Sequence, residues 1–316
     1  MIFLPPRWNI KRGLNGDFVF KGMTVLFAFS ILGILLLMTV AMYRQSLPSL
    51  AKTGWSFITA KEWDPVEGNF GALPYIHGSL LSSLLSLALA TPLSIATALF
   101  ITEVTNRRLG SMIAALVELL AAIPSVIYGL WGILVMAPWL QRTVEPFLND
   151  HFGSLPFFSG APYGVSMLAA VLILMIMIVP IITSITKEVL LAVPDSQREA
   201  AIALGATRWE MIRMAVLPYG RSGILGAVIL GLGRAIGETM AVTMVIGNTP
   251  KISWSLLDPG YTMPSVIANE FAEASSDLHA AALMEIGLIL LVITLVINIM
   301  ARLLLWSVTR TAGGKA

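Results

Sequence analysis

Long apolar stretches separated by short polar segments dominate the chain, and their lengths predict helices that cross a membrane. A helix needs about 20 mainly apolar residues to span a bilayer, and its backbone groups must bond internally in lipid. Six stretches with at most two charges each meet this requirement: 22–43, 78–102, 111–140, 163–186, 222–249 and 280–301. The pattern therefore predicts an all-α membrane protein with six transmembrane helices.

The polar segments divide the chain and orient it. We expect a cytoplasmic N-terminal segment at 1–21, a transmembrane domain at 22–307 and a flexible tail at 308–316. The first apolar run exceeds the roughly 7–15 residues of a signal peptide, so we interpret it as a retained helix. Of the 20 Lys and Arg residues, 14 fall on the side of the termini and five in the opposite loops, which predicts that both termini are cytoplasmic.

Composition restricts the classes of function. The 316-residue chain is 57% apolar and only 12% charged, whereas soluble domains carry about 25% charged residues, so a soluble enzyme is excluded. The net charge of +2 gives no support for a nucleic-acid partner. Cysteines are absent, the three histidines are scattered, and no GxxxxGK[ST] phosphate loop occurs. We therefore expect no bound metal, no cofactor and no ATP hydrolysis on this chain.

The polar loop between the fourth and fifth spans is the most informative one. Ser196 and Glu199 have the spacing of a capping box, so a short helix should begin there. Gly205 should end that helix, and a second box at Thr207 and Glu210 should begin another short helix. Small residues beside Glu199 leave room for a docking protein. A plain connector between two spans is the alternative interpretation.

At this loop the chain resembles the permease subunits of ABC importers. Their EAA motif reads Glu-Ala-Ala, three residues, Gly, nine residues, Ile, one residue, Leu-Pro. The matching positions here are Glu199, Ala200, Ala201, Gly205, Ala215, Leu217 and Pro218. Ala215 in place of Ile is a departure that removes apolar bulk but keeps the spacing. The resemblance implies a MetI-like fold whose loop 187–216 couples to an ATPase subunit through Ser196, Glu199, Ala200, Ala201 and Gly205.

Further motifs resemble one branch of that family, the C-type permeases of phosphate-specific importers. These motifs are EWD at 62–64, ELLAAIPSVIYGLWG at 118–132, GLGRAIGETMAV at 231–242, IGNT at 246–249 and ANEF at 268–271. The resemblance implies ATP-driven phosphate import by alternating access across the bacterial inner membrane. It implies a heterodimer with the A-type phosphate permease, two copies of an ATP-binding subunit that hold ATP and Mg, and a periplasmic phosphate-binding protein.

Two charges interrupt the fifth apolar stretch. If that span enters lipid near Ile224, Arg234 lies about 15 Å deep at 1.5 Å per residue, where an arginine costs about 2.5–3.5 kcal/mol. Because a planar guanidinium suits phosphate oxygens, we expect Arg234 to bind or gate the anion. Glu238 follows four residues later on the same helix face. We interpret the two as a pair that phosphate can separate, with a purely structural ion pair as the alternative.

Other candidates surround these charges. The small-residue spacing that lets helices pack closely occurs at Gly226, Gly233 and Gly237. Glu118 precedes Pro124, which should kink the third span, and it either pairs with Arg234 or lies at the cytoplasmic end of its helix. Asn248 either meets an anion leaving the binding protein or caps a loop. Glu285, near the outer end of the sixth span, is expected in a structural pair or at an interface.

Two other functions stay open at this point. The same fold could import another oxyanion, such as sulfate or molybdate, because the residues alone indicate only an anion. Alternatively, the chain serves as a phosphate-sensing or assembly protein that does not transport. That role requires the docking loop but no charge inside the membrane. A membrane enzyme is disfavoured because the sequence shows no convergent acid, base and nucleophile.

Overall fold

The computed structural model describes the backbone of residues 10–313 and the side chains of residues 16–307. The ends of the predicted N-terminal segment and tail, 1–9 and 314–316, lie outside the described residues. Within the described part no extended strand forms, and one isolated bridge joins Asp64 to Asn69. The helices, with short π or 3₁₀ turns labelled η, are α1 (Ile10–Thr53), α2 (Ser56–Thr59), α3 (Leu73–Leu99), η1 (Phe100–Val104), α4 (Arg107–Ala121), α5 (Ser125–Trp131), η2 (Gly132–Met136), α6 (Ala137–Trp139), η3 (Leu140–Val144), α7 (Glu145–Phe152), α8 (Met167–Leu191), α9 (Asp195–Ala203), α10 (Arg208–Met211), η4 (Ile212–Val216), α11 (Leu217–Ile236), α12 (Met240–Val245), α13 (Met263–Glu270), η5 (Phe271–Glu273) and α14 (Asp277–Gly313).

Five continuous helical segments of the described chain are long and apolar enough to cross a membrane. They are Gly16–Thr53, Leu73–Val104, Met167–Leu191, Arg208–Ile236 and Asp277–Ser307. The third predicted span is instead a bent pair, because α4 and the helix from α5 to α7 meet at 89°. Pro124 causes this bend: it lacks a backbone N–H and adopts an extended conformation at the N-cap of α5. With the bent pair counted as one span, the structure has the six spans that the sequence predicts.

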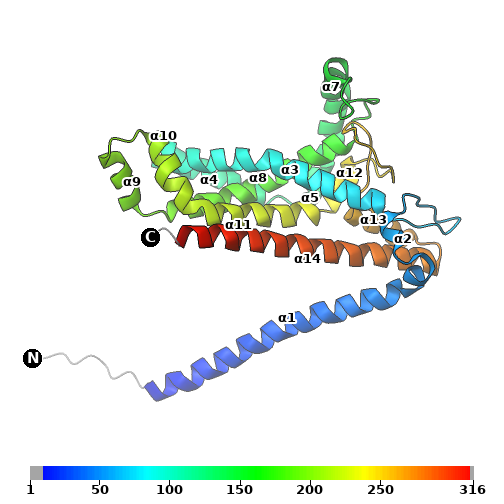
Figure 1. The fold of residues 1–316 in the computed structure, drawn as a ribbon, viewed down its shortest axis with the longest axis horizontal. Helices are drawn as coiled ribbons and strands as arrows, with labels where there is room; N and C mark the ends of the chain where they lie inside the picture. The colour runs from blue at the N-terminus through cyan, green and yellow to red at the C-terminus, as the bar shows by residue number, and fades with distance from the viewer. Residues whose placement is uncertain (1–9, 314–316) are drawn as a thin grey trace, which may run out of the picture.

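The long helices run side by side, and α8 is the central one (Figure 1). It packs against α3, α4 and α11, and 56% of its most apolar stretch is buried. Leu174, Ile178 and Ile182 of α8 belong to the main core. Helices α9 and α10 lie at one end of the bundle, here called the α9 end, and α2 and α13 lie at the other, the α13 end.

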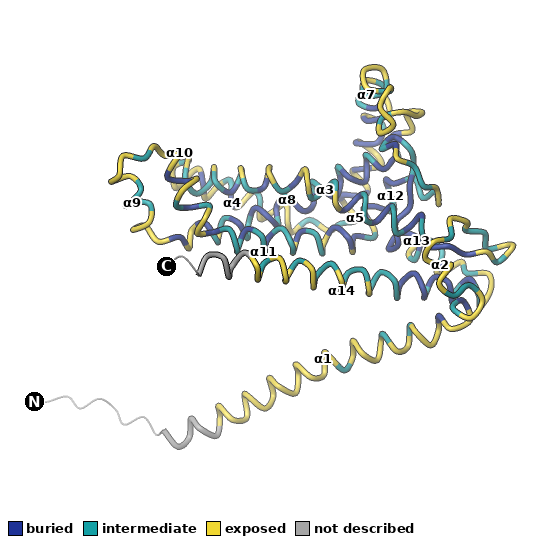
Figure 2. The backbone as a smooth tube through the Cα atoms, viewed as in Figure 1, coloured by how far each residue is buried: buried dark blue, intermediate teal, exposed yellow. Residues whose placement is uncertain are grey.

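Helix α1 stands apart from the bundle. It meets α14 near the α13 end and diverges from it along the rest of its length, where Figure 2 shows it almost wholly exposed. None of the residues in its most apolar stretch is buried. A helix that is apolar on all sides requires lipid or another apolar surface around it, so α1 is a membrane helix with free flanks in this chain.

A second core closes the α13 end. The indole N–H of Trp63 donates to Glu270 Oε2 at 2.9 Å, and His279 Nε2 lies 3.1 Å from the same oxygen. The ring of His279 stacks on Phe70 with 5.5 Å between centroids. These contacts bind the loop after α2 to α13 and to the first turn of α14, so this end of the bundle is held by side chains from distant parts of the chain.

Candidate functional site

The fifth predicted span is broken, and the break positions its two charges. Helix α11 ends at Ile236 and α12 begins at Met240, and α11 stops short of the ends of α3 and α14 in Figure 1. Gly237, a poor helix former, lies at the C-cap of α11. The prediction of one continuous helix over 222–249 is therefore wrong.

Arg234 and Glu238 bond across this break. Arg234 Nη2 lies 3.2 Å from Glu238 Oε2, which confirms that the two side chains pair. Glu238 Oε1 also accepts a hydrogen bond from the backbone N–H of Ala241, at 3.3 Å, in the first turn of α12. The arginine thus lies near the C-terminus of α11 and the carboxylate near the N-terminus of α12, where the helix dipoles favour those signs of charge.

The two charged side chains differ sharply in exposure. Glu238 is 4% exposed, whereas the side chain of Arg234 is 48% exposed. The carboxylate is therefore fixed inside the chain, and the guanidinium lies on the flank of the bundle. Because arginine has five N–H donors in a planar fork, a half-exposed guanidinium can receive an anion without leaving its helix.

The predicted packing glycines lie on an open face of α11. A Cβ atom added at Gly226 or Gly233 would meet nothing within 4 Å, and at Gly237 it would meet only the carbonyl oxygen of Gly233 at 3.5 Å. A Cβ atom at Gly231 would instead lie 2.7 Å from the side chain of Ile182. Gly231 therefore permits the close approach of α11 and α8. The three predicted glycines pack against no helix in the described part of the chain.

Two weaker candidates have other partners. Glu118 forms an ion pair with Lys187 of α8 at 3.0 Å and is 58% exposed, so the suggested pairing with Arg234 is wrong. Asn248 lies three residues after the end of α12, adopts a positive φ of 47° and donates its amide N–H to the carbonyl oxygen of Thr243 at 2.8 Å. The structure thus shows Asn248 in the capping arrangement, which was the alternative to an anion contact.

The loop 187–216 forms two helices joined by a glycine turn, as predicted. Gly205 follows α9 with a φ of +86°, a conformation that suits glycine. Thr207 and Glu210 form the expected capping box at the start of α10. Helix α10 then continues through η4 into α11, so the second helix of the loop is also the beginning of the fifth span.

The first helix of this loop starts in a different way from the prediction. Helix α9 begins at Asp195 with Pro194 at its N-cap, and no side chain caps it, so the predicted Ser196 box is wrong. The extended backbone of Pro194 sets the helix start ahead of Ser196. Glu199 and Ala200 lie on the exposed side of α9, while Ala201 is half-buried.

A cleft of about 490 Å³ opens between α9 and the helix formed by α10 and η4. It is lined by Gln197, Ala200, Ala201, Leu204, Gly205, Ala206, Glu210, Met214 and Ala215. Ala215, at the position where the EAA motif has Ile, forms part of the wall, so the smaller side chain leaves the cleft wider. Beside it, Leu204 is 90% exposed and Trp209 is 62% exposed. Exposed apolar side chains around a cleft are typical of a protein contact.

Arg198 fixes α9 to the membrane helices, a role that the sequence did not indicate. Its Nη2 lies 2.9 Å from Oε1 of Glu103, in η1 at the end of α3, and the two side chains are 17% and 5% exposed. Arg198 also donates to the carbonyl oxygens of Leu190 and Val193, at the end of α8 and just beyond it. The hydrogen bond with Glu103 is the main cause that raises the pKa of Arg198, so the guanidinium stays charged. No local pattern could reveal a contact between residues 95 positions apart.

The described residues include no group of three His, Asp or Glu side chains that could hold a metal ion. The described side chains instead provide a positive group at a broken membrane helix and a separate cleft at the α9 end.

Comparisons with known proteins agree on the type of protein. Residues 90–309 match the family described as binding-protein-dependent transport system inner membrane component. The phosphate transport system permease protein PstC of Mesorhizobium japonicum is 44% identical over 309 residues, which cover 96% of this chain and 94% of that protein. PstC of Haemophilus influenzae is 42% identical over 299 residues, covering 93% and 95%. PstC 2 of Mycobacterium tuberculosis is 40% identical over 321 residues, covering 97% and 95%.

Solved structures share the fold at lower identity. A bacterial ABC transporter involved in the import of the acidic polysaccharide alginate aligns with a TM-score of 0.59 at 19% identity, covering 93% of this chain and 99% of that one. The inward-facing MetNI methionine ABC transporter aligns with a TM-score of 0.52 at 17% identity, covering 77% and 95%. Both similarities indicate a MetI-like permease fold.

Proposed function

Because the chain belongs to the inner-membrane components of binding-protein-dependent transport systems, among the PstC permeases of phosphate transport, we propose that it forms one half of a phosphate path at Arg234. It is a permease of a phosphate ABC importer in the inner membrane, and this family is not a family of enzymes. The observation that carries the proposal is the half-exposed guanidinium beside the break between α11 and α12.

In this proposal, phosphate and Glu238 compete for Arg234. The carboxylate is buried and also bonded to the backbone of α12, so it stays in place when the anion arrives. The guanidinium is the exposed partner and can turn toward phosphate oxygens, to which it can donate two parallel hydrogen bonds. Return of Arg234 to Glu238 would then release the anion. The pair would therefore bind and release the anion reversibly.

The second half of the path is assigned to the A-type phosphate permease. Arg234 lies beside the open face of α11 that carries Gly226 and Gly233, and its side chain is half-exposed, so a helix of another chain packed on that face can approach the guanidinium. An arginine on this flank requires an anion, a polar partner or water, because lipid alone would leave its charge unsolvated. Two permease chains that meet here would enclose a path between them.

Energy for the cycle is assigned to two copies of an ATP-binding subunit, one of which docks at the cleft between α9 and α10 of this chain. The exposed Glu199 and Ala200 and the apolar rim at Leu204 and Trp209 provide that contact surface. Arg198 transmits a displacement of α9 directly to α3 through Glu103. ATP and Mg would bind on the partner subunits, and a periplasmic phosphate-binding protein would deliver the anion.

ATP-driven uptake of radiolabelled phosphate by the reconstituted complex tests the path. We expect Arg234→Ala to reduce uptake by at least about a hundredfold while assembly is kept, since losing a bidentate charged contact costs about 3 kcal/mol or more. Sulfate in excess should not compete with phosphate in the wild-type complex.

Arg142→Ala is the matched control, because Arg142 is an exposed arginine in η3, an element other than α11 and α12. It should leave uptake unchanged. Normal uptake by Arg234→Ala would overturn the proposed path and favour a structural or sensing role for this charge. Strong competition by sulfate would extend the substrate class to other oxyanions.

A further inference from the structure

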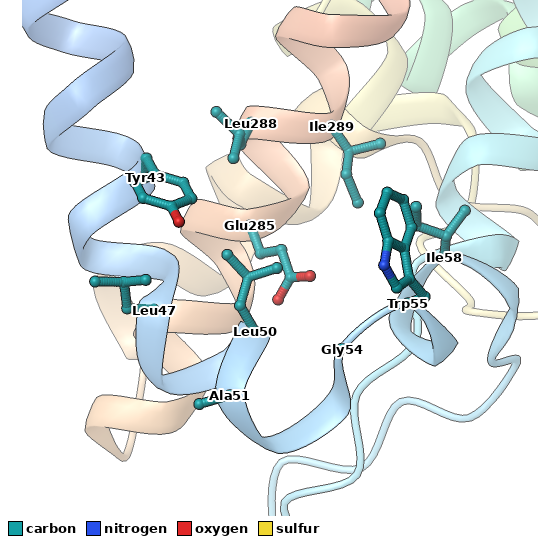
Figure 3. Close-up of a pocket in the computed structure, with 10 residues that line it drawn as sticks. All are labelled: Tyr43, Leu47, Leu50, Ala51, Gly54, Trp55, Ile58, Glu285, Leu288 and Ile289. Atoms are coloured by element: carbon teal, nitrogen blue, oxygen red, sulfur yellow. The ribbon is translucent and has the colours of Figure 1, made fainter.

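A pocket of about 440 Å³ lies between the end of α1 and the first turns of α14, away from the proposed path (Figure 3). Its lining residues are Tyr43, Leu47, Leu50, Ala51, Gly54, Trp55, Ile58, Glu285, Leu288 and Ile289. Figure 3 shows the carboxyl group of Glu285 extending from α14 into the space between the two helices, with Trp55 across from it. The walls are otherwise apolar, apart from the hydroxyl of Tyr43 and the indole N–H of Trp55.

Glu285 is the unusual feature of this pocket. It is 3% exposed, and its Oε2 has no hydrogen-bond partner. The side chain of Ser49, also buried, lies next to the carboxyl group, but neither Ser49 Oγ nor Glu285 Oε2 makes a well-formed hydrogen bond. No described side chain forms an ion pair with Glu285, so the structural pair expected for it is not formed within the chain. Two buried oxygens without a well-formed hydrogen bond leave room for a further donor, because buried polar groups are almost always hydrogen-bonded.

The chemistry of the pocket specifies that donor. A carboxylate and a hydroxyl can accept several N–H hydrogen bonds from one positive group, and a positive group also neutralises the buried charge. The walls formed by Leu47, Leu288 and Ile289 suit an apolar group next to the cation. We propose that the pocket binds a phospholipid with a primary-amine headgroup, whose ammonium group bonds to Glu285.

The position of the pocket favours a lipid over a free amine. Both of its helices are membrane helices, and the outer flank of α1 is exposed, so lipid has direct access. Glu285 lies eight residues after Asp277, the first residue of α14, which is about 12 Å along the helix and close to headgroup depth. Trp55 is 87% exposed and Tyr43 is 51% exposed at this level, as is typical of aromatic residues at the membrane interface.

Bound lipids can be counted directly, without any measurement of transport. The full-length chain, with the subunits that co-purify with it, is reconstituted in vesicles of equal phosphatidylethanolamine, phosphatidylcholine and phosphatidylglycerol, and extracted in mild detergent. Retained lipids are then quantified by mass spectrometry. We expect phosphatidylethanolamine to exceed phosphatidylcholine about tenfold at one site per chain, because the quaternary ammonium of phosphatidylcholine has no N–H to donate.

Two variants distinguish the effect of the Glu285 charge from the effect of the pocket volume. Glu285→Gln should abolish the preference for phosphatidylethanolamine, and Ala51→Phe should fill the pocket and displace the lipid while leaving the carboxyl group intact. Glu273→Gln, an exposed carboxylate in η5 at the same end of the bundle, should behave as wild type.

Several results would overturn the proposal. One is equal retention of the two lipids by the wild type, and another is an unchanged preference in Glu285→Gln. A third is loss of the lipid on washing with free ethanolamine at the concentration of the lipid amine, which would assign the pocket to small amines. Occupation of the pocket by a helix of a co-purifying protein, detected by cross-linking from Ala51, would also exclude a lipid.

Discussion

At the scale of single residues, Glu238 holds two partners that belong to different helices. Its Oε2 pairs with Arg234 at the end of α11, and its Oε1 accepts from Ala241 in α12. One carboxylate therefore joins the two halves of the broken span. When Arg234 leaves Glu238 for an anion, the change is transmitted to α12 through this single side chain. A substitution of Glu238 that keeps its size tests this role.

Glu238→Gln keeps an oxygen that can accept from Ala241 but removes the charge that competes with phosphate. We expect the KM of phosphate uptake to fall about fivefold, because a part-exposed ion pair contributes about 1 kcal/mol, and the maximal rate to fall because release is slower. Initial rates over a range of phosphate concentrations measure both values. Glu118→Gln, which removes an exposed carboxylate paired with Lys187, should keep the wild-type KM. An unchanged KM in Glu238→Gln would identify a purely structural ion pair.

At the scale of helices, some features could be predicted from the sequence and others could not. A bend at Pro124 could be expected because proline lacks the N–H that a helix interior needs, but Pro92 and Pro180 lie inside the continuous helices α3 and α8, so the residue type alone does not fix where a span bends. The break after Ile236 could not be expected, since glycine is common in membrane helices and Gly231 and Gly233 remain helical in the same segment. The spacing of the glycines alone therefore does not show which of them ends the helix.

The contact between Arg198 and Glu103 illustrates the same limit. The sequence showed Arg198 only as one charge in a loop, whereas the structure joins it to η1 and to the end of α8. By contrast, the box at Thr207 and Glu210 was predictable because its partners are three residues apart. Local bonds can thus be inferred from spacing, and the long-range bonds that link α9 to the bundle cannot.

Removing the Arg198–Glu103 contact should partly uncouple phosphate transport from ATP hydrolysis. For Glu103→Gln we expect a loss of stability of about 1–3 kcal/mol, because a buried charged hydrogen bond is weakened. We also expect fewer phosphate ions transported per ATP hydrolysed. Thermal unfolding and parallel assays of uptake and ATP hydrolysis on the reconstituted complex measure these effects.

Asp195 provides a matched control, because it pairs with the same arginine at 3.2 Å but is 89% exposed. Asp195→Asn should change stability by less than about 0.5 kcal/mol, as expected for an exposed ion pair, and leave the ratio of uptake to hydrolysis unchanged. If both variants behaved alike, α9 would be fixed by its backbone contacts and not by the buried charge of Glu103.

At the scale of the whole molecule, the bundle has surfaces that its own helices do not cover. Helix α1 diverges from the bundle (Figure 2), and the face of α11 at Gly226 and Gly233 is open, next to the half-exposed Arg234. These surfaces explain why a chain with a well-packed core around α8 still leaves a charged side chain on its flank. The proposed path requires that a second permease covers the α11 face, and two glycines on opposite sides of α11 allow that requirement to be tested.

Gly226→Leu and Gly231→Leu place the same side chain on the open and the packed side of α11. At Gly226 no atom lies within 4 Å of the new Cβ, so the chain itself should keep its stability or gain up to about 1 kcal/mol of helix propensity. Association with the second permease, measured by co-purification, should nevertheless be lost, because the added side chain occupies the contact. At Gly231 the Cβ would lie 2.7 Å from Ile182, so the chain itself should lose about 1–3 kcal/mol in thermal unfolding. Retention of the second permease and of uptake by Gly226→Leu would show that lipid, and not a permease, covers this face, and the path would then have to lie elsewhere.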